Sequence, residues 1–117
     1  MWNIDSSDEY DAWFLTLDDE SKEAVLQRVL LLRQYGPNLP RPYADVLHGS
    51  KKRKNLKELR TKTQKHLLRA AYYFDSERNA FLLIGGDKKG KDQHTFYADL
   101  IAEPEVIVEK HEKKVRK

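Results

Sequence analysis

The chain has 117 residues and a formal net charge of +3, a small total that hides a strong separation of charge along the sequence. That length suits one compact domain, so we expect a single domain over residues 1–117, with a basic tail (110–117) free to fray. The absence of cysteine excludes thiol nucleophiles, disulfides and cysteine-ligated metal sites. No apolar run approaches the roughly 20 residues of a membrane span, so we expect a cytoplasmic protein without membrane contacts.

Two helices are predicted near the N-terminus. Apolar residues recur at three- and four-residue intervals over residues 7–17, which is the period of an amphipathic helix. Asp18 is a suitable cap for a second, longer helix that starts near Asp19 and stops at Gly36-Pro37. The prolines of residues 37–50 then predict a loop rather than a helix or strand.

After this loop the pattern becomes extended. Three strands are predicted, joined by polar connections of hairpin length: Asn55–Thr61, Leu67–Phe74 and Ala80–Gly85. A C-terminal helix follows, capped by Asp92, and Pro104 either ends it or starts a further helix. The predicted fold class is α+β, with two N-terminal helices packed on a small antiparallel β-sheet and a C-terminal helix.

Basic residues are concentrated in the first part of this predicted sheet. Residues 51–69 hold nine Lys and Arg and a single acid, Glu58, whereas residues 1–20 hold seven acids and no base. Clustered cations repel one another, so such a patch indicates a polyanionic ligand. Because Arg60 and Arg69 lie within two predicted strands, the pattern favours a catalytic surface for RNA.

The order of these segments resembles a known family. After two helices and a Gly-Pro loop come Leu56-Lys57-Glu58-Leu59-Arg60, the strand Arg69-Ala70-Ala71-Tyr72-Tyr73-Phe74-Asp75, and Ile84-Gly85-Gly86-Asp87-Lys88-Lys89 before a helix with Phe96-Tyr97. Over nearly the whole chain this is similar to the HigB-like, phage-derived branch of the RelE/ParE toxin superfamily. The resemblance implies the toxin of a type II toxin-antitoxin system. RelE-like members cleave mRNA on the ribosome without a cofactor, and in HigB systems a HigA-like antitoxin with a helix-turn-helix domain neutralises the toxin.

The resemblance also assigns roles to residues. RNA cleavage by attack of the 2′-hydroxyl requires a proton acceptor, cations for the charge that develops on phosphate, and an acid for the leaving oxygen. Arg69 matches the central-strand arginine of RelE-like nucleases, and Arg60 matches their basic strand. Glu58 stands where RelE has lysine, so it is either the general base or a residue that holds Arg60 in position.

Further candidates lie outside these two strands. The resemblance places Lys88 at a basic position after the last strand and Tyr97 at the aromatic of the C-terminal helix, although Tyr97 also fits a core stripe. The remaining cations are candidates for binding the RNA backbone: Lys51, Lys52, Arg53, Lys54, Lys57, Lys62, Lys65, Lys89 and Lys91.

Two alternatives to a nuclease remain open on sequence alone. The ParE branch shares the fold and inhibits gyrase without hydrolysing anything, and a non-toxic RNA-binding module would also explain the basic band. Retention of basic residues and Tyr97 at family-like positions favours the nuclease. A phosphate-binding loop at Gly85–Lys91 is disfavoured, because Asp92 follows where such loops need Ser or Thr for magnesium.

Overall fold

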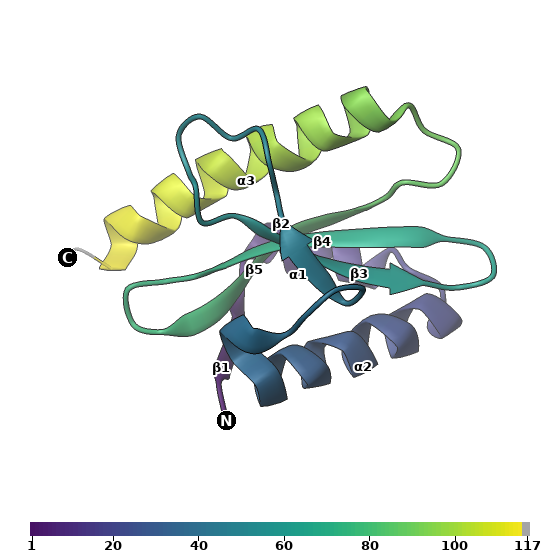
Figure 1. The fold of residues 1–117 in the computed structure, drawn as a ribbon, viewed down its shortest axis with the longest axis horizontal. Coiled ribbons are helices and arrows are strands. Elements are labelled where there is room, and N and C mark those ends of the chain that lie inside the picture. The colour runs from purple at the N-terminus through teal and green to yellow at the C-terminus, as the bar shows by residue number, and fades with distance from the viewer. Residues whose placement is uncertain (116–117) are drawn as a thin grey trace.

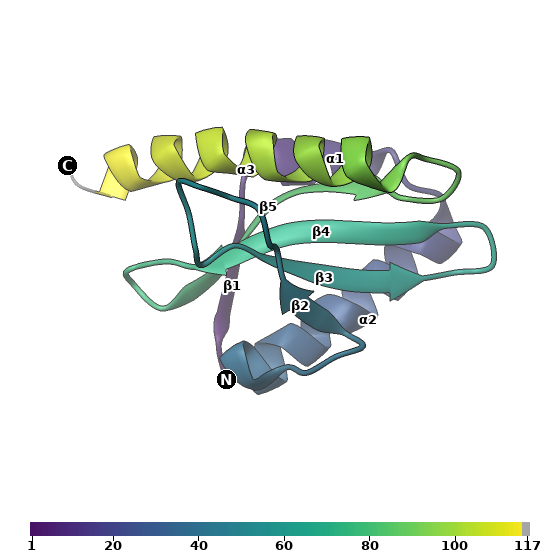
Figure 2. The ribbon, with the colours of Figure 1, turned by 45° about the horizontal axis from the view of Figure 1, so that its top comes forward.

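One sheet separates two layers of helix in the computed structural model, which describes residues 1–115 (Figure 1). The strands are β1 (Asn3–Ser6), β2 (Ala44–Val46), β3 (Lys57–Lys62), β4 (Leu67–Phe74) and β5 (Asn79–Asp87), arranged in the order β1-β5-β4-β3-β2. The helices are α1 (Asp8–Leu15), α2 (Asp19–Tyr35) and α3 (Gln93–Val115), with a short 3-10 turn at Gly36–Asn38. Figure 2 shows the sheet nearly edge-on, with α3 along one face and α2 along the other.

Local capping explains where the N-terminal helices begin. The Ser7 hydroxyl accepts the backbone N–H of Tyr10 at 2.9 Å, and the Asp18 carboxylate accepts that of Ser21 at 2.7 Å. Helix α2 ends at Gly36, which has a φ of +57° and packs so closely on Trp2 that a side chain would collide with the indole. Both predicted helices are confirmed, although α1 ends at Leu15 instead of residue 17.

The alternation of β4 divides the core between the two faces. Ala70 and Tyr72 belong to the core under α1 and α2, whereas Ala71 and Tyr73 belong to the core under α3, where the Tyr73 ring contacts Phe81 and His111. A register shift between β4 and β5 skips one residue of β5, so consecutive β5 residues lie against the α3 core. The three predicted strands are confirmed, although the first is Lys57–Lys62 instead of Asn55–Thr61 and the last extends from Asn79 to Asp87.

Several details of the predicted fold need correction. Residues 37–50 are not all loop, because Ala44–Val46 form β2 by pairing with β3. The sheet is mixed rather than antiparallel, since β1 pairs with β5 in parallel. The α+β class itself is confirmed.

The C-terminal helix also differs from the prediction. Pro104 neither ends nor starts a helix but lies buried inside α3, where the packing of Leu100, Ile107 and Val108 offsets the lost backbone hydrogen bond. Residues 110–115 of the basic tail continue α3, and the last two lie outside the described residues. Within residues 1–115, no helix combines the length and apolar character needed to cross a bilayer.

Candidate active site

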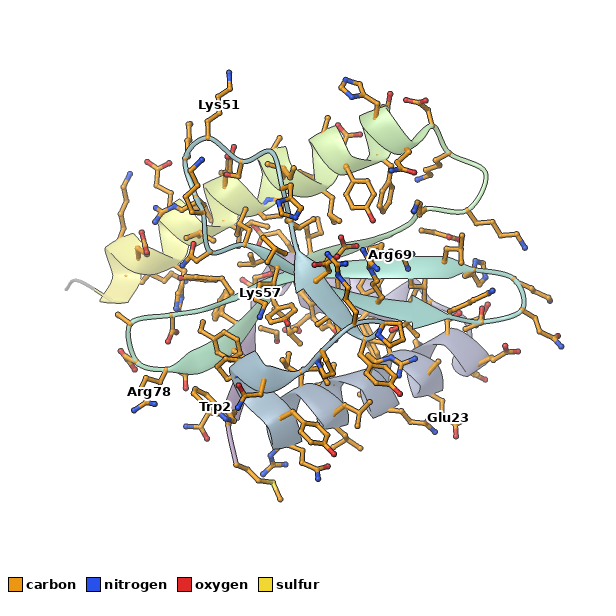
Figure 3. All side chains as sticks on the ribbon, in the orientation of Figure 1. Trp2, Glu23, Lys51, Lys57, Arg69 and Arg78 are labelled. Carbon is orange, nitrogen blue, oxygen red and sulfur yellow. The ribbon has the colours of Figure 1, made fainter. Side chains whose placement is uncertain are left out.

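The two arginines singled out in the sequence are direct neighbours in the sheet. Arg60 of β3 pairs with Arg69 of β4, so their side chains leave the sheet on the same face. Arg69 alternates with Ala71 and Tyr73, which places both guanidinium groups on the face that α3 covers. Figure 3 shows Arg69 near the middle of the sheet. Two adjacent cations repel each other, so this arrangement requires a compensating anion.

Glu58 provides that anion. Its side chain is 4% exposed, and its Oε1 lies 3.3 Å from Nε of Arg69 and 3.5 Å from Nε of Arg60. Neither Nε–H is aligned for a hydrogen bond, so these contacts are ion pairs. A buried carboxylate between two guanidinium groups neutralises their repulsion and fixes their positions.

Tyr97 reaches the same carboxylate from the first turns of α3. Its hydroxyl donates a hydrogen bond to Oε1 of Glu58 at 2.8 Å. Burial raises the pKa of Tyr97 above its ordinary value, and the bond to Glu58 adds to that increase against the opposing effect of Arg69. The tyrosine is therefore a proton donor at neutral pH. Lys88 lies over its ring, with Nζ 5.5 Å from the ring centroid.

Sequence reasoning missed two residues that hold Arg60. Asp45, opposite Glu58 across β2 and β3, lies 3.2 Å from Nη2 of Arg60 and 3.0 Å from Nε of Arg41. Burial alone would raise the pKa of Asp45, but hydrogen bonds and these guanidinium groups hold it below its ordinary value. From α2, Nε of Arg28 donates to the backbone oxygen of Arg60 at 2.9 Å.

A second basic region lies in the connection between β2 and β3, which passes over α3 (Figure 1). We call residues 48–55 the basic loop. Lys51, Lys52 and Lys54 are exposed there, and Lys51 points outward in Figure 3. Arg53 is different, since its guanidinium lies 2.7 Å from Glu112 on α3.

The other predicted RNA-binding lysines do not form one surface. Lys57 projects to the opposite sheet face and lies over the Phe74 ring at 6.0 Å. Lys62 and Lys65 are exposed at the β3-β4 turn, where Nζ of Lys89 donates to the backbone oxygen of Gln64 at 3.4 Å.

The remaining lysine, Lys91, lines a separate cavity. This cavity of about 400 Å³ lies beside Phe96, and its wall includes Asp92, Asp99 and Glu103. Three carboxylates make it unsuited to phosphate, and it contains neither of the two arginines. Over residues 1–115, no group of three His, Asp or Glu side chains converges in a way that could hold a metal ion.

Comparison with known proteins shows which family this chain belongs to. Residues 12–103 match the family described as phage derived protein Gp49-like (DUF891). The chain belongs to this family. It is 34% identical over 99 residues to putative toxin HigB2 of Mycobacterium tuberculosis, and 38% identical over 78 residues to putative toxin HigB3 of the same organism.

The alignments cover only part of each relative. The alignment covers 84% of this chain but 49% of HigB2, and 67% of this chain but 66% of HigB3. The chain thus spans about half the length of one relative and just under two thirds of the other.

The fold is also that of a solved toxin. The structure of a free, doubly substituted E. coli toxin RelE superposes with a TM-score of 0.59, covering 86% of this chain and 94% of that one. The sequence identity is only 9%, so this likeness concerns the fold alone. The family match and the similarity to HigB2 and HigB3 confirm the predicted HigB-like, phage-derived family, and the likeness to RelE agrees with the predicted fold.

Proposed function

We propose that this member of the Gp49-like family is the toxin of a type II toxin-antitoxin system. We further propose that it works in the cytoplasm as an endoribonuclease on mRNA bound to the ribosome, stopping translation. The observation that carries the proposal is the position of Arg60 and Arg69, side by side across β3 and β4 and fixed by a buried carboxylate.

The geometry suits cleavage by the neighbouring 2′-hydroxyl. In that reaction the 2′-oxygen bonds to phosphorus, the 5′-oxygen leaves, and negative charge develops on the phosphate oxygens. Guanidinium groups bind two such oxygens in one plane and keep their charge at any physiological pH. Arg69 and Arg60 would stabilise this charge, and no metal ion is needed for that step.

Tyr97 and Lys88 would assist departure of the 5′-oxygen, Tyr97 as the general acid and Lys88 as a nearby positive charge. A tyrosine with a raised pKa holds its proton and can pass it to the leaving 5′-oxygen. Lys88, at 5.5 Å from the ring, adds positive charge where the leaving oxygen would form.

We assign Glu58 to positioning and not to proton abstraction. Its Oε1 already contacts Tyr97 and both arginines, and the side chain is 4% exposed. A general base must reach the 2′-hydroxyl within hydrogen-bonding distance, which this burial opposes. The proton of the 2′-hydroxyl would then pass to water.

The proposal includes a cognate antitoxin, because both relatives are named as toxins. By the resemblance to HigB systems, this antitoxin would be HigA-like, with a helix-turn-helix domain.

Induction of the chain in cells, with mapping of RNA ends and a gyrase assay in parallel, tests the activity. Codon-phased mRNA cuts are expected, and they should be absent with Arg69→Ala. DNA breaks without new RNA ends would instead identify a gyrase inhibitor of the ParE type. Binding of RNA without growth arrest or cleavage would identify an RNA-binding module.

A further inference from the structure

We propose that α3 fixes the basic loop in place through Glu105 and Glu112. These two residues would position Lys51, Lys52 and Lys54 on the RNA backbone without touching the RNA themselves. The inference rests on the proposed function, since it assigns the loop to the same substrate as the arginine pair.

Two polar contacts join the middle of the loop to α3. Ser50 is buried, and its hydroxyl donates to Glu105 at 2.5 Å while accepting the backbone N–H of Arg53 at 2.9 Å. The guanidinium of Arg53 then pairs with Glu112 at 2.7 Å. Both side chains of this pair are partly buried, with 28% and 32% exposed, so water screens it less than a fully exposed pair.

The flanks of the loop are fixed as well. Leu47 and Leu56 are buried in the core under α3, and the N–H of Leu47 donates to the oxygen of Leu56 at 2.9 Å. Gly49 has a φ of +106°, and a side chain there would start 3.4 Å from Ile101 of α3. The loop is therefore held against α3 at its base and at its middle.

These contacts and the tyrosine of the candidate active site use the same side of α3. Tyr97, Ile101, Glu105 and Glu112 are separated by four, four and seven residues, which places them along one face of a helix. At about 1.5 Å per residue, Glu105 lies roughly 12 Å and Glu112 roughly 22 Å along the axis from Tyr97. One rigid helix thus sets the spacing between the arginine pair and the basic loop.

The lysines of the loop remain available to a ligand. Among the described residues, no acid lies within ion-pair distance of Lys51, Lys52 or Lys54, whereas Arg53 is paired. The expected RNA-binding role of Arg53 therefore becomes an anchoring role. Three exposed ammonium groups on a fixed loop can track phosphates without reading sequence.

The sign of the change in RNA affinity distinguishes a positioning role of Glu112 from a purely electrostatic effect of its negative charge. Removing a carboxylate near a polyanion site should tighten RNA binding if charge alone matters. We expect Glu112→Gln to weaken binding of a fluorescein-labelled, mixed-sequence single-stranded RNA by about 3- to 10-fold. The matched control is Glu109→Gln, one turn earlier on α3, whose carboxylate contacts Lys113 instead of the loop. Equal tightening by both variants would overturn the proposal.

The charge-neutral change Ser50→Ala should weaken binding in the same direction as Glu112→Gln. Circular dichroism and urea unfolding establish that each variant is folded. In cleavage assays on ribosomes, both variants should raise KM and leave kcat unchanged, which general destabilisation would not produce. Unchanged KM in a folded variant counts against the proposal.

A charge exchange tests the anchor directly. The double variant Arg53→Glu with Glu112→Arg keeps the net charge and can re-form the pair in reverse. We expect its RNA affinity to return to within about 2-fold of the parent, whereas Arg53→Glu alone stays weak. If Arg53 itself binds phosphate, the double variant remains as weak as the single one, and the proposal fails.

Failure of the proposed function would look different. In that case the parent chain cleaves no RNA at all, while the order of RNA affinities among these variants still reports on the loop. If the parent cleaves RNA and all loop variants match it, only the positioning role is wrong.

Discussion

Two basic regions only a few residues apart in the sequence are built in opposite ways. Arg60 and Arg69 lie within strands, with side chains that are 32% and 11% exposed and are paired with a carboxylate. Lys51, Lys52 and Lys54 are exposed on a loop, with no acid beside them among residues 1–115. The cationic side chains are paired and partly buried in the first region, whereas those of the second are exposed and, among the described residues, unpaired on a backbone that α3 holds.

This difference matches two different physical tasks. Stabilising a transition state requires donors held within a fraction of an ångström, and burial strengthens their effect because water no longer screens them. Retaining a long polyanion requires cations near its phosphates with less precision than catalysis does, and the resulting binding depends on salt. We therefore expect changes in the arginine pair to affect rate and changes in the loop to affect affinity.

The largest effect should come from Arg69→Ala. Loss of one preorganised cation at a developing oxyanion typically costs about 10²- to 10³-fold in kcat, and we expect a loss in that range with little change in KM. Single-turnover cleavage of ribosome-bound mRNA measures it, after circular dichroism has shown that the variant is folded. Arg69→Lys is the matched control for charge. It should recover only part of the rate, because an ammonium cannot bind two oxygens in a plane.

The Arg69→Ala experiment also tests whether the arginine pair is catalytic at all. If a folded Arg69→Ala chain cuts mRNA as fast as the parent, then the arginine pair is only a structural ion-pair network. The chemistry would have to be sought elsewhere.

A smaller loss of rate is expected for Glu58→Gln. The amide can still accept the Tyr97 hydrogen bond but no longer neutralises the arginines, so we expect kcat to fall by about 10-fold. Loss of a general base would cost about 10²- to 10⁴-fold and would remove the acidic limb of the pH-rate profile. Asp45→Asn is the matched control, because Asp45 holds Arg60 but lacks the contact with Arg69. A loss of 10³-fold restricted to Glu58→Gln would make Glu58 the base.

Changing the loop should alter affinity but not the chemical step. Replacing Lys51, Lys52 and Lys54 together by Ala should reduce the slope of log K against log salt by about 2, because each phosphate contact on single-stranded RNA contributes about 0.7. Fluorescence anisotropy at several salt concentrations measures the slope, and kcat should stay within about 2-fold. Lys57→Ala is the matched control, since Lys57 lies on the opposite sheet face and should not change the slope. An unaltered slope in the triple variant would remove the loop from the RNA surface.

Local sequence patterns predicted most of the fold, and the missing parts depend on distant partners. The helices α1 and α2 and the strands β3 to β5 follow from periodicity and caps within each segment. The strands β1 and β2 have four and three residues and exist because β5 and β3 supply backbone partners. Such short, polar or proline-flanked segments carry no periodic signal of their own.

The candidate site shows the same limit. In a strand over Asn55–Thr61, alternation alone puts Glu58 and Arg60 on one face and Lys57 on the other, and the structure agrees. Nothing local indicates that Asp45 holds Arg60, because this contact depends on the register of β2 with β3. The pair of Arg53 and Glu112 joins residues far apart in the sequence, so only the packing of α3 reveals it.

The smallest effect is expected for a third charged cluster, formed by His66, Asp87 and Asp18, on the stability of the fold. Its side chains are paired like the two arginines but partly exposed. His66 at the β3-β4 turn lies between Asp87 at the end of β5, near Nδ1, and Asp18 at the cap of α2, 3.1 Å from Nε2. The hydrogen bond with Asp87 is the main cause that raises the pKa of His66 above its ordinary value of 6.5, with a further contribution from Asp18 against the opposing effect of desolvation. A raised folded-state pKa stabilises the protein fully below pH 6.5, and this contribution is lost as pH rises through the folded value.

The urea midpoint of the parent chain should therefore fall from pH 6 to pH 9 by more than that of His66→Gln, which cannot titrate. His94→Gln, which alters an exposed histidine at the start of α3, is the control and should keep the parent's pH dependence. Parallel curves for the parent and His66→Gln would mean that the cluster adds no pH-dependent stability. A clear difference would show that partial burial lets an ion pair join three segments of the fold, which the exposed lysines of the basic loop do not do.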